Sequence, residues 1–348
     1  MSTLETETTA QKVREVRMNI FVAGGSGTIG VPLVRALVAN GHRVTATTRS
    51  PEKAALISAH GATPIVVDAL DARALERAVQ SAAPTHVIHQ LTALPKAGPR
   101  RARDLQPTNR LRDEGTRNLL RAATASRAER IIVGSFAMLG TNPDSRAVVR
   151  DPATAAVKSM ESQVLEAAAR GVIEGIVLRY GLFYGPGNPG TEELLASVRR
   201  RRLPRIRHDD GQLPFIHMVD AVSATLAALD RGWSGRVYNV VDDEPASFSD
   251  FVSEIAAISN SPRPVALPSW VVRVFAPYMS RLARSRFPAT NAEARMELAW
   301  TPQFPSYRDG LRQTIAQSSN RSSPKPSAAV VEARGGRHSG SIRISTDR

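Results

Sequence analysis

The sequence predicts an α/β protein: a doubly wound parallel sheet with a smaller C-terminal lobe. Observations near the start of the chain predict this fold. The apolar run Ile20–Ala23 is typical of a strand that is buried on both faces of a parallel sheet. A glycine-rich turn follows, and then an alanine-rich apolar segment over Val31–Asn40 that ends before Gly41, as a helix would. A second strand over Arg43–Thr48 completes a strand–turn–helix–strand unit.

The glycine-rich turn predicts a cradle for a diphosphate. Gly24 allows the sharp turn, Gly27 lets the backbone approach the ligand, and Gly30 lets helix and strand pack closely. At the start of the helix, the N–H groups of Thr28 and Ile29 and the positive end of the helix dipole would face the anion. An empty structural turn is the alternative, but the flanking strands and helix favour a dinucleotide-binding site.

The end of the second strand indicates which dinucleotide binds. A site for NAD places Asp or Glu there to bind the ribose 2′-hydroxyl, whereas this strand is followed by Arg49, with Lys53 nearby. A guanidinium in this place would bind a 2′-phosphate through charge-assisted hydrogen bonds. We therefore expect NADP rather than NAD, with an exposed surface arginine as the alternative interpretation.

Further strands are expected at Thr63–Asp68, Thr85–Gln90 and Arg130–Ser135. The second of these carries His86 and His89. Because both lie in a buried strand, we interpret them as packed or hydrogen-bonded core histidines rather than catalytic groups.

The formal net charge of +14 suggests nucleic-acid binding, but the distribution of the arginines argues against it. They are scattered along all 348 residues, and the two dense runs, at 100–103 and 199–202, have no interleaved aromatic residues. We expect an anionic cofactor or substrate to account for part of the excess, and no nucleic-acid partner.

The chain also shows no sign of a membrane span, because no apolar run approaches the necessary length. The first residues lack the apolar core of a secretory signal. Cysteine is absent, which excludes disulfides and thiolate-based metal sites, and no metal site is expected. A cytoplasmic location is compatible with this composition and is our expectation.

Several strings along the chain resemble those of one family. They are Gly-x-x-Gly-x-x-Gly at 24–30, Gly-Thr-x-Asn-Leu-Leu at 115–120, Leu-Arg-Tyr-Gly with Tyr-Gly-Pro-Gly at 178–187, and Phe-Ile-His-x-x-Asp at 215–220. The chain resembles the extended and atypical branches of the short-chain dehydrogenase/reductase superfamily, the NAD-dependent epimerase/dehydratase relatives, over about residues 18–316. The resemblance implies a Rossmann-like fold. A first departure is Arg112, which stands where the relatives often have Asn.

The resemblance implies further site residues. Asp68 would bind the adenine amino group, with a role as N-cap of the helix over Asp71–Ala82 as the alternative. Leu91 and Thr92 correspond to the wall of small residues along the cofactor. Ser135 corresponds to the catalytic Ser or Thr that hydrogen-bonds the reacting oxygen, with a strand-end cap as the alternative.

The relatives' proton donor, a Tyr four residues before a Lys on one helix face, is missing. None of the five tyrosines has a Lys four residues later. One register places Thr154 and Lys158 in the two positions, and a register anchored on Glu161 places Ala153 in the Tyr position. Threonine is far too weak an acid to replace the phenol. Lys158 is predicted to hold the ribose hydroxyls, or else to be a solvated helix lysine.

A phenol from elsewhere is one replacement for the missing acid. Tyr184 is the candidate, with Tyr180 as the second choice and aromatic packing as the alternative. A substrate group or an ordered water chain would also serve. Ser135, Lys158 and Tyr184 are therefore the candidate catalytic residues.

The expected organisation has four parts. They are a disordered leader over 1–17, a dinucleotide-binding core over 18–187, a substrate lobe over 188–316 whose strand 235–241 returns to the sheet, and a disordered tail over 317–348. Segment 269–286 is expected to cover the substrate pocket, with contact to a membrane surface as the alternative. Arg205, Arg207 and His208 would meet an anionic substrate, or else carry surface charge. The resemblance also implies a homodimer through helices 109–123 and 155–170.

The predicted function is NADP-dependent hydride transfer on a carbonyl or carbinol of a small molecule or a nucleotide-linked sugar, as in an oxidoreductase or epimerase. A non-catalytic NADP-binding sensor that acts through a protein partner is the alternative, because the proton donor is missing.

Overall fold

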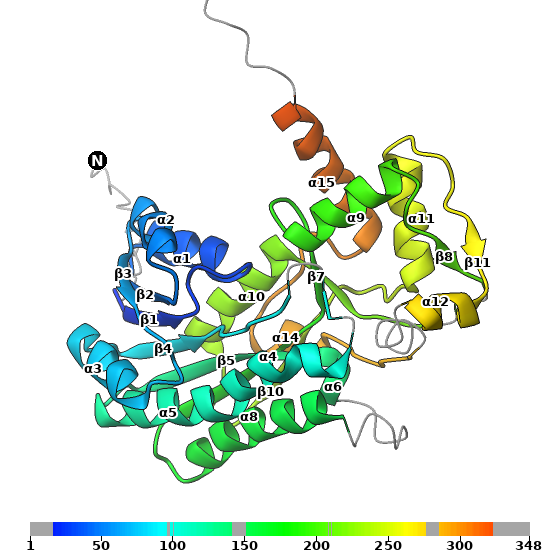
Figure 1. The fold of residues 1–348 in the computed structure, drawn as a ribbon. Helices are drawn as coiled ribbons and strands as arrows, with labels where there is room; N and C mark the ends of the chain where they lie inside the picture. The colour runs from blue at the N-terminus through cyan, green and yellow to red at the C-terminus, as the bar shows by residue number, and fades with distance from the viewer. Residues whose placement is uncertain are drawn as a thin grey trace, which may run out of the picture.

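The computed structural model describes residues 17–95, 98–99, 101–140, 151–207, 209, 211–275 and 285–322. Its centre is a seven-stranded sheet with the order β10-β6-β5-β4-β1-β2-β3 (Figure 1). The strands are β1 (Asn19–Ala23), β2 (Arg43–Thr48), β3 (Thr63–Val66), β4 (His86–His89), β5 (Arg130–Phe136), β6 (Glu174–Tyr180) and β10 (Val237–Val240). Every neighbouring pair is parallel, which confirms the predicted doubly wound sheet.

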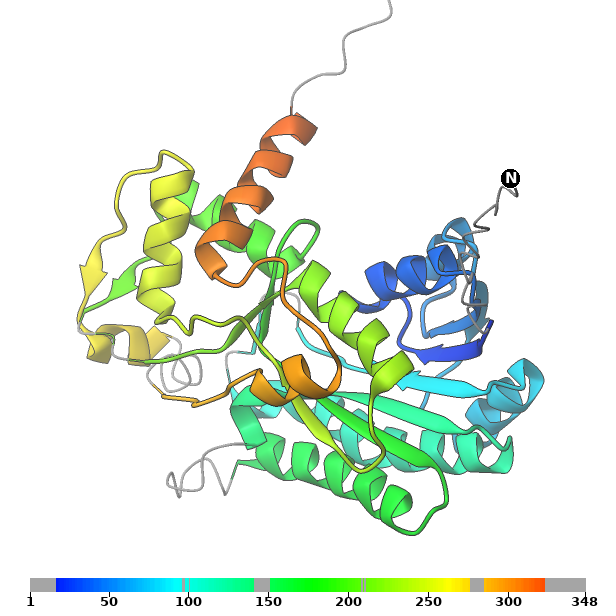
Figure 2. The ribbon, with the colours of Figure 1, turned by 180° about the vertical axis from the view of Figure 1, so that it is seen from behind.

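Helices cover both faces of the sheet, because alternate residues of each buried strand point to opposite sides. Phe21 and Ala23 of β1 pack with α3 (Ala72–Ala82), α5 (Thr116–Ala125) and α8 (Pro152–Ala169). Ile20 and Val22 pack toward the other face. That face is covered by α1 (Gly30–Ala39) and α10 (Met218–Arg231), with α14 (Ala292–Glu297) beside β10. Figures 1 and 2 show the two layers from opposite sides.

Shorter elements connect these units at the edge of the sheet where the strands end. They are η1 (Pro51–Lys53), α2 (Ala54–Ala59), η2 (Ala102–Leu105), α4 (Gln106–Arg110), η3 (Leu111–Gly115) and α6 (Ala137–Gly140). The η3 segment is a turn of π-helix between α4 and α5, and it contains Arg112. Such turns are rare and occur frequently at functional sites.

A smaller lobe lies beyond the end of the sheet. It contains β7 (Leu182–Tyr184), α9 (Pro189–Arg199), β8 (Arg205–Ile206), β9 (Phe215–His217), α11 (Phe248–Ile258), β11 (Ala266–Leu267), α12 (Ser269–Phe275) and α15 (Tyr307–Ser322). Phe215, Phe251 and Tyr307 form the centre of its separate apolar core. In the sequence, β10 comes between two groups of elements of this lobe. It pairs with β6 in the main sheet, as expected for the strand over 235–241.

Three predicted segments lie partly outside the described residues. The leader over 1–17 does so except for Arg17, and the tail is described only up to residue 322. There α15 continues to Ser322, and the boundary at 317 stays a prediction. Segment 269–286 begins with the helix α12, and its residues 276–284 lie outside the described part.

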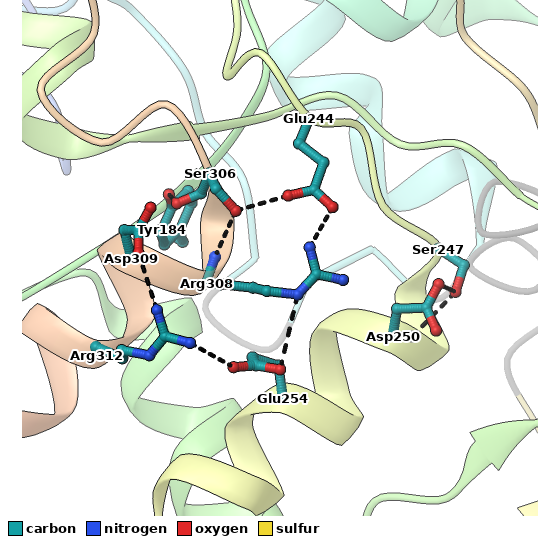
Figure 3. A network of polar contacts seen from close by, with 9 residues as sticks. All are labelled: Tyr184, Glu244, Ser247, Asp250, Glu254, Ser306, Arg308, Asp309 and Arg312. Carbon is teal, nitrogen blue, oxygen red and sulfur yellow. Dashed lines mark hydrogen bonds and ion pairs between the residues drawn. The ribbon is translucent and has the colours of Figure 1, made fainter.

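Ion pairs join α15 to α11 on the surface of the lobe (Figure 3). Arg308 contacts Glu244 and Glu254, and Arg312 contacts Glu254 and Asp309. These side chains are partly or largely exposed to solvent, so each pair contributes little to the free energy of unfolding. The apolar core beneath them holds the lobe together.

A buried polar pair connects the lobe to the end of β10. The Tyr184 hydroxyl donates to Asp242 Oδ2 at 2.8 Å, and the backbone N–H of His217 donates to Oδ1 at 3.3 Å. Burial raises the pKa of Asp242 to about 8, and the nearby Asp220 carboxylate adds to the increase. Burial and the Asp242 carboxylate also raise the pKa of the Tyr184 phenol.

This pair predicts a pH dependence of stability. The folded protein holds the Asp242 proton up to about pH 8, whereas an unfolded chain releases it near pH ~4. The folded state therefore binds more protons between these values, and the stability gained from this proton is lost as the pH rises toward the higher one. The free energy of unfolding should fall with rising pH by at most about 1.4 kcal/mol per pH unit.

Urea unfolding at several pH values measures this slope. Asp242→Asn keeps an oxygen acceptor but cannot titrate, so its unfolding free energy should change less between about pH 6 and about pH 9 than that of the wild type. Asp230→Asn, at an exposed position near the end of α10, is the matched control and should keep the wild-type slope. Parallel curves for the wild type and Asp242→Asn would contradict the prediction.

Candidate active site

The carboxyl ends of the strands define the candidate site. The connection from β1 leads to β2 on one side, and the connection from β4 leads to β5 on the other. The order of the strands therefore reverses between β1 and β4. In open parallel sheets, ligands bind in the crevice outside the strand ends at such a switch point.

The turn after β1 is confined on two sides. Gly24 has φ = +90°, and a Cβ atom there would lie 2.7 Å from the carbonyl oxygen of Gln90, next to the end of β4. A Cβ atom at Gly30 would lie 2.2 Å from the Gly24 carbonyl oxygen. Gly25 is needed as well, since its Cβ would lie 2.5 Å from that of Ala46. The sequence analysis missed Gly25, because the motif gives it no special position.

This turn fits a diphosphate. Gly27 and Thr28 are exposed, and α1 has no acidic residue in its first turn to compete with an anion. Among the described residues, the backbone N–H groups of Thr28 and Ile29 have no hydrogen-bond acceptor. Free N–H groups at the start of a helix are the donors that bind phosphate in dinucleotide folds.

The end of β2 lies next to this turn. Thr48 Oγ1 accepts hydrogen bonds from the Ser26 hydroxyl at 2.8 Å and from the Ser50 backbone N–H at 3.2 Å. Arg49, between them, is exposed. The Ser50 hydroxyl donates to Glu52, and this hydrogen bond lowers the pKa of that carboxyl. The nearest acid after the strand in sequence is therefore already engaged by a side chain of its own loop.

Asp68 lies after β3 and is exposed. Its carboxylate accepts the N–H of Leu70 at 3.0 Å, while Asp71 caps α3 by accepting the N–H of Ala74 at 3.0 Å. The alternative interpretation of Asp68 as the helix cap was therefore wrong. Its contact with adenine stays a prediction.

His89 fixes the exit of β4. It is fully buried, its Nε2 lies 3.0 Å from Thr116 Oγ1, and its Nδ1 accepts the Leu91 N–H at 3.2 Å. Burial lowers its pKa to about 4, so the ring is neutral and Nε2 carries the proton. The interpretation of His89 as a hydrogen-bonded core histidine is confirmed. Leu91 is half-buried and Thr92 is exposed.

A buried hydrogen-bonded group lies at the end of β5. The Ser135 hydroxyl is 2.5 Å from Glu161 Oε1, and Arg179 donates to both oxygens of Glu161 at 2.9 and 2.6 Å. Ser135 and Glu161 are only 8% and 5% exposed. The sequence analysis identified Ser135 but not its two partners, which come from α8 and β6.

The register anchored on Glu161 concerns one face of α8. Ala153 and Val157 precede Glu161 by eight and four residues, so the three share that face. In this register, which stays a prediction, Ala153 and Val157 would stand in the positions of the relatives' Tyr and Lys. They are fully buried and form an apolar cluster with Leu105, against which Phe136 packs.

The other register would place Thr154 and Lys158 in the positions of the relatives' Tyr and Lys. Lys158 is exposed, one position beyond the face that carries Val157 and Glu161. Thr154 is buried, and its Oγ1 has no hydrogen-bond partner among the described residues. The predicted contact of Lys158 with the ribose is not tested by these positions and stays a prediction.

The two candidate phenols are both engaged elsewhere. Tyr184 donates to Asp242 within the lobe, as described above. The Tyr180 hydroxyl lies 2.7 Å from Thr225 Oγ1 and accepts a hydrogen bond from Gln90 Nε2 at 3.3 Å. Burial raises the pKa of Tyr180 to about 12. Both phenols are therefore weaker acids than a free tyrosine.

Metal ligands, membrane-spanning helices and the residues proposed to meet an anionic substrate remain to be described. In the described ranges, no three His, Cys, Asp or Glu side chains converge so that they could hold a metal ion. Every helix in the same ranges is too short or too polar to cross a bilayer. Arg205 is half-buried and Arg207 is exposed in the lobe, and His208 lies outside the described residues.

Comparison with known proteins agrees with this fold and site. A model of the NAD dependent epimerase/dehydratase family matches residues 20–241. The chain belongs to this family, as its motifs suggested, and is an NAD(P)-dependent enzyme of the oxidoreductase and epimerase type. It is 36% identical over 311 residues to the 3-diazoavenalumate denitrifying reductase of a Streptomyces species, covering 84% of this chain and 99% of the relative.

More distant relatives share the fold. A ketoreductase of Stigmatella aurantiaca that acts on a farnesyl dihydroquinoline oxide is 29% identical, covering 80% of this chain and 84% of that protein. The UDP-glucose 4-epimerase of Thermotoga maritima, solved with UDP-glucose, superposes with a TM-score of 0.72 at 21% identity, covering 87% of this chain and 99% of that one. The Thermus thermophilus UDP-glucose 4-epimerase with NAD gives 0.69 at 22% identity, covering 85% and 97%.

The turn after β1 yields a testable prediction. A Cβ at Gly27 would lie 3.2 Å from the Gly24 carbonyl oxygen, a tight contact that a small shift relieves. Gly27→Ala should therefore keep the free energy of unfolding within about 1 kcal/mol of the wild type. Its methyl group would stand where the diphosphate approaches, so dinucleotide affinity should fall by about tenfold or more. Calorimetric titration and thermal unfolding measure the two effects.

Gly190→Ala is the matched control. Its Cβ would meet Asn188 Oδ1 at 3.1 Å, an equally tight contact with its own chain, at the start of α9. This variant should bind the dinucleotide as the wild type does. Unchanged affinity in Gly27→Ala would show that the diphosphate does not rest on this turn.

Proposed function

We propose that this protein is an NADPH-dependent reductase that delivers a hydride to a small acceptor without receiving a proton from a tyrosine. The observation that carries the proposal is the apolar cluster of Ala153, Val157 and Leu105. In the register anchored on Glu161, Ala153 and Val157 of this cluster would stand in the positions of the relatives' Tyr and Lys. When bound, the cofactor supplies the hydride. The turn at residues 24–30 would hold its diphosphate, and the crevice beside β4 and β5 would hold the acceptor.

NADPH rather than NADH is supported by the end of β2. Arg49 is exposed there, and the hydrogen bonds around Thr48 hold the loop beside the glycine turn. A guanidinium can bind a 2′-phosphate through two parallel hydrogen bonds. Asp68 would contact the adenine from the end of β3.

An acceptor that carries its own positive charge suits such a site. We infer an aryl diazonium, or the related diazo group, as the acceptor class, since the Streptomyces relative is named for a diazo compound. Hydride adds to the terminal nitrogen of ArN₂⁺ to give ArN=NH. This product loses N₂ as its hydrogen moves to the ring carbon, leaving ArH. Hydride and positive charge cancel, so no proton is required from the protein.

Carbonyl reduction is the second candidate, because the Stigmatella relative is named a ketoreductase. It requires a proton on the oxygen, which water or a substrate group would supply here. Tyr184 is not assigned this role, since its phenol is a weakened acid that already donates to Asp242. We therefore expect ketones to be the slower acceptors.

Isotope transfer tests the proposal. Purified protein is incubated with an aryl diazonium carboxylate and NADPH that carries deuterium at the transferred position, and the arene is analysed by mass spectrometry. Deuterium on the ring with release of N₂ supports the proposal. Diazonium salts also react without catalysis, so reactions without protein and with Gly27→Ala measure the background. Oxidation of NADPH at the background rate, with ketone acceptors reduced faster, would contradict it.

Arg49 predicts the cofactor preference. Hydrogen bonds to charged groups contribute about 1.5–3 kcal/mol, so Arg49→Ala should weaken NADPH binding by roughly 10- to 100-fold and leave NADH binding unchanged. Fluorescence titration with each nucleotide measures this difference.

Arg43→Ala is the control, because Arg43 is also exposed but lies at the opposite end of β2. It should leave both affinities unchanged. Equal loss of NADPH and NADH affinity in Arg49→Ala would count against a 2′-phosphate contact.

A further inference from the structure

The group formed by Ser135, Glu161 and Arg179 joins three elements at the end of the sheet. Ser135 and Arg179 are paired residues on the neighbouring strands β5 and β6, and Glu161 reaches them from α8. Arg179 binds Glu161 with two hydrogen bonds, and Glu161 Oε1 accepts from both Arg179 Nε and Ser135 Oγ. The pKa of Arg179 is raised by this contact.

The chemistry of the three groups indicates which residue carries the proton in the contact between Ser135 and Glu161. A carboxyl group that a guanidinium binds on both oxygens is ionised and has no proton to donate. The proton in the 2.5 Å contact therefore belongs to Ser135, which donates it to Glu161. Turning it away would remove a hydrogen bond to a charged group, so the turned form should be populated about 10- to 100-fold less.

The remaining lone pairs of Ser135 are what this residue offers to a ligand. Ala153 and Val157 lie on the same face of α8 as Glu161, and Leu105 of η2 forms an apolar cluster with them. The side chains of these three residues contain no hydrogen-bond donor. A ligand group at the end of β5 therefore meets an oxygen acceptor beside hydrocarbon.

We propose, building on the reductase function above, that Glu161 and Arg179 are positioning residues that hold the Ser135 proton away from the acceptor. Ser135 then accepts a hydrogen bond or faces a positive charge, instead of donating to a carbonyl oxygen. This arrangement selects acceptors with a cationic or hydrogen-bond-donating group next to the atom that receives the hydride. A neutral ketone places its own lone pairs against those of Ser135 and is disfavoured.

Removing the positioning pair as a whole tests the inference. Glu161→Leu combined with Arg179→Met avoids leaving one buried charge without its partner. The Ser135 proton is then free to turn. The ratio of kcat/KM for a ketone to that for an aryl diazonium should rise about tenfold or more, while NADPH affinity stays unchanged. An unchanged ratio in a folded double variant that binds NADPH would overturn the proposal.

Two single variants make the test independent of how well the double variant folds. Glu161→Gln keeps an oxygen facing Ser135 but removes the charge, so it should shift the acceptor preference toward ketones, as the double variant does but by less. Ser135→Ala leaves the Glu161–Arg179 pair intact but removes the oxygen, and should lower kcat/KM for the diazonium about tenfold. Ser135→Thr, which keeps a hydroxyl oxygen at this position, should have a kcat/KM for the diazonium close to that of the wild type. If Ser135→Ala leaves that value unchanged, Ser135 does not face the acceptor and the inference fails.

Binding of inert compounds separates this inference from the reductase function. An aryl carboxylate with an ethynyl group and one with a nitrile have the same linear shape, but the first ends in a weak C–H donor and the second in a nitrogen acceptor. The wild-type protein with NADP⁺ should bind the ethynyl compound more tightly by calorimetry, and the double variant should lose or reverse this preference. A wild-type preference for the nitrile would overturn the inference whether or not any acceptor is reduced.

Discussion

The contact between the start of α1 and the turn after β1 determines where chemistry can occur in this protein. A side chain at Gly30 would collide with the Gly24 carbonyl, and one at Gly24 would collide with the end of β4 at Gln90. The turn is therefore held between its own helix and the neighbouring strand. The N–H groups of Thr28 and Ile29, which have no acceptor among the described residues, belong to this confined backbone. A diphosphate held by them would be fixed relative to the exit of β4.

This constraint does not involve the helix on which the family's acid is expected. The glycine turn is confined by α1 and by the exit of β4, whereas α8, which would carry the Tyr and Lys positions, packs against the opposite face of the sheet. Ala153 and Val157 are apolar, so they need only be shielded from water. Leu105 and Phe136 pack against them and provide that shielding. Glu161 is different, because a buried carboxylate without a partner would be costly. Arg179 supplies that partner.

The parts of the fold that follow from local pattern were predictable from the sequence. The unit from β1 to β2, the parallel order and the buried role of His89 all rest on short apolar runs and glycine positions. The register of α8 relative to the family's Tyr and Lys stays a prediction, because Ala153 and Thr154 are adjacent on the helix and both are buried. The contact of Glu161 with Ser135, 26 residues away, is a pairing that the sequence pattern did not indicate. The π-helical turn at Leu111–Gly115 likewise has no sequence signature, and polar composition concealed the last turn of α15.

On the proposed function, the surroundings of the acceptor would also favour one kind of hydride transfer over another. Reduction of a ketone separates charge, because it creates an alkoxide beside a nicotinamide that has become positive. Apolar side chains such as Val157 and Leu105 could not stabilise that pair, and charge separation costs more where the dielectric constant is low. Reduction of a diazonium ion moves one positive charge from acceptor to nicotinamide and creates no anion. In the register anchored on Glu161, hydrocarbon would stand in place of a tyrosine and a lysine, which are groups that the first reaction needs and the second does not.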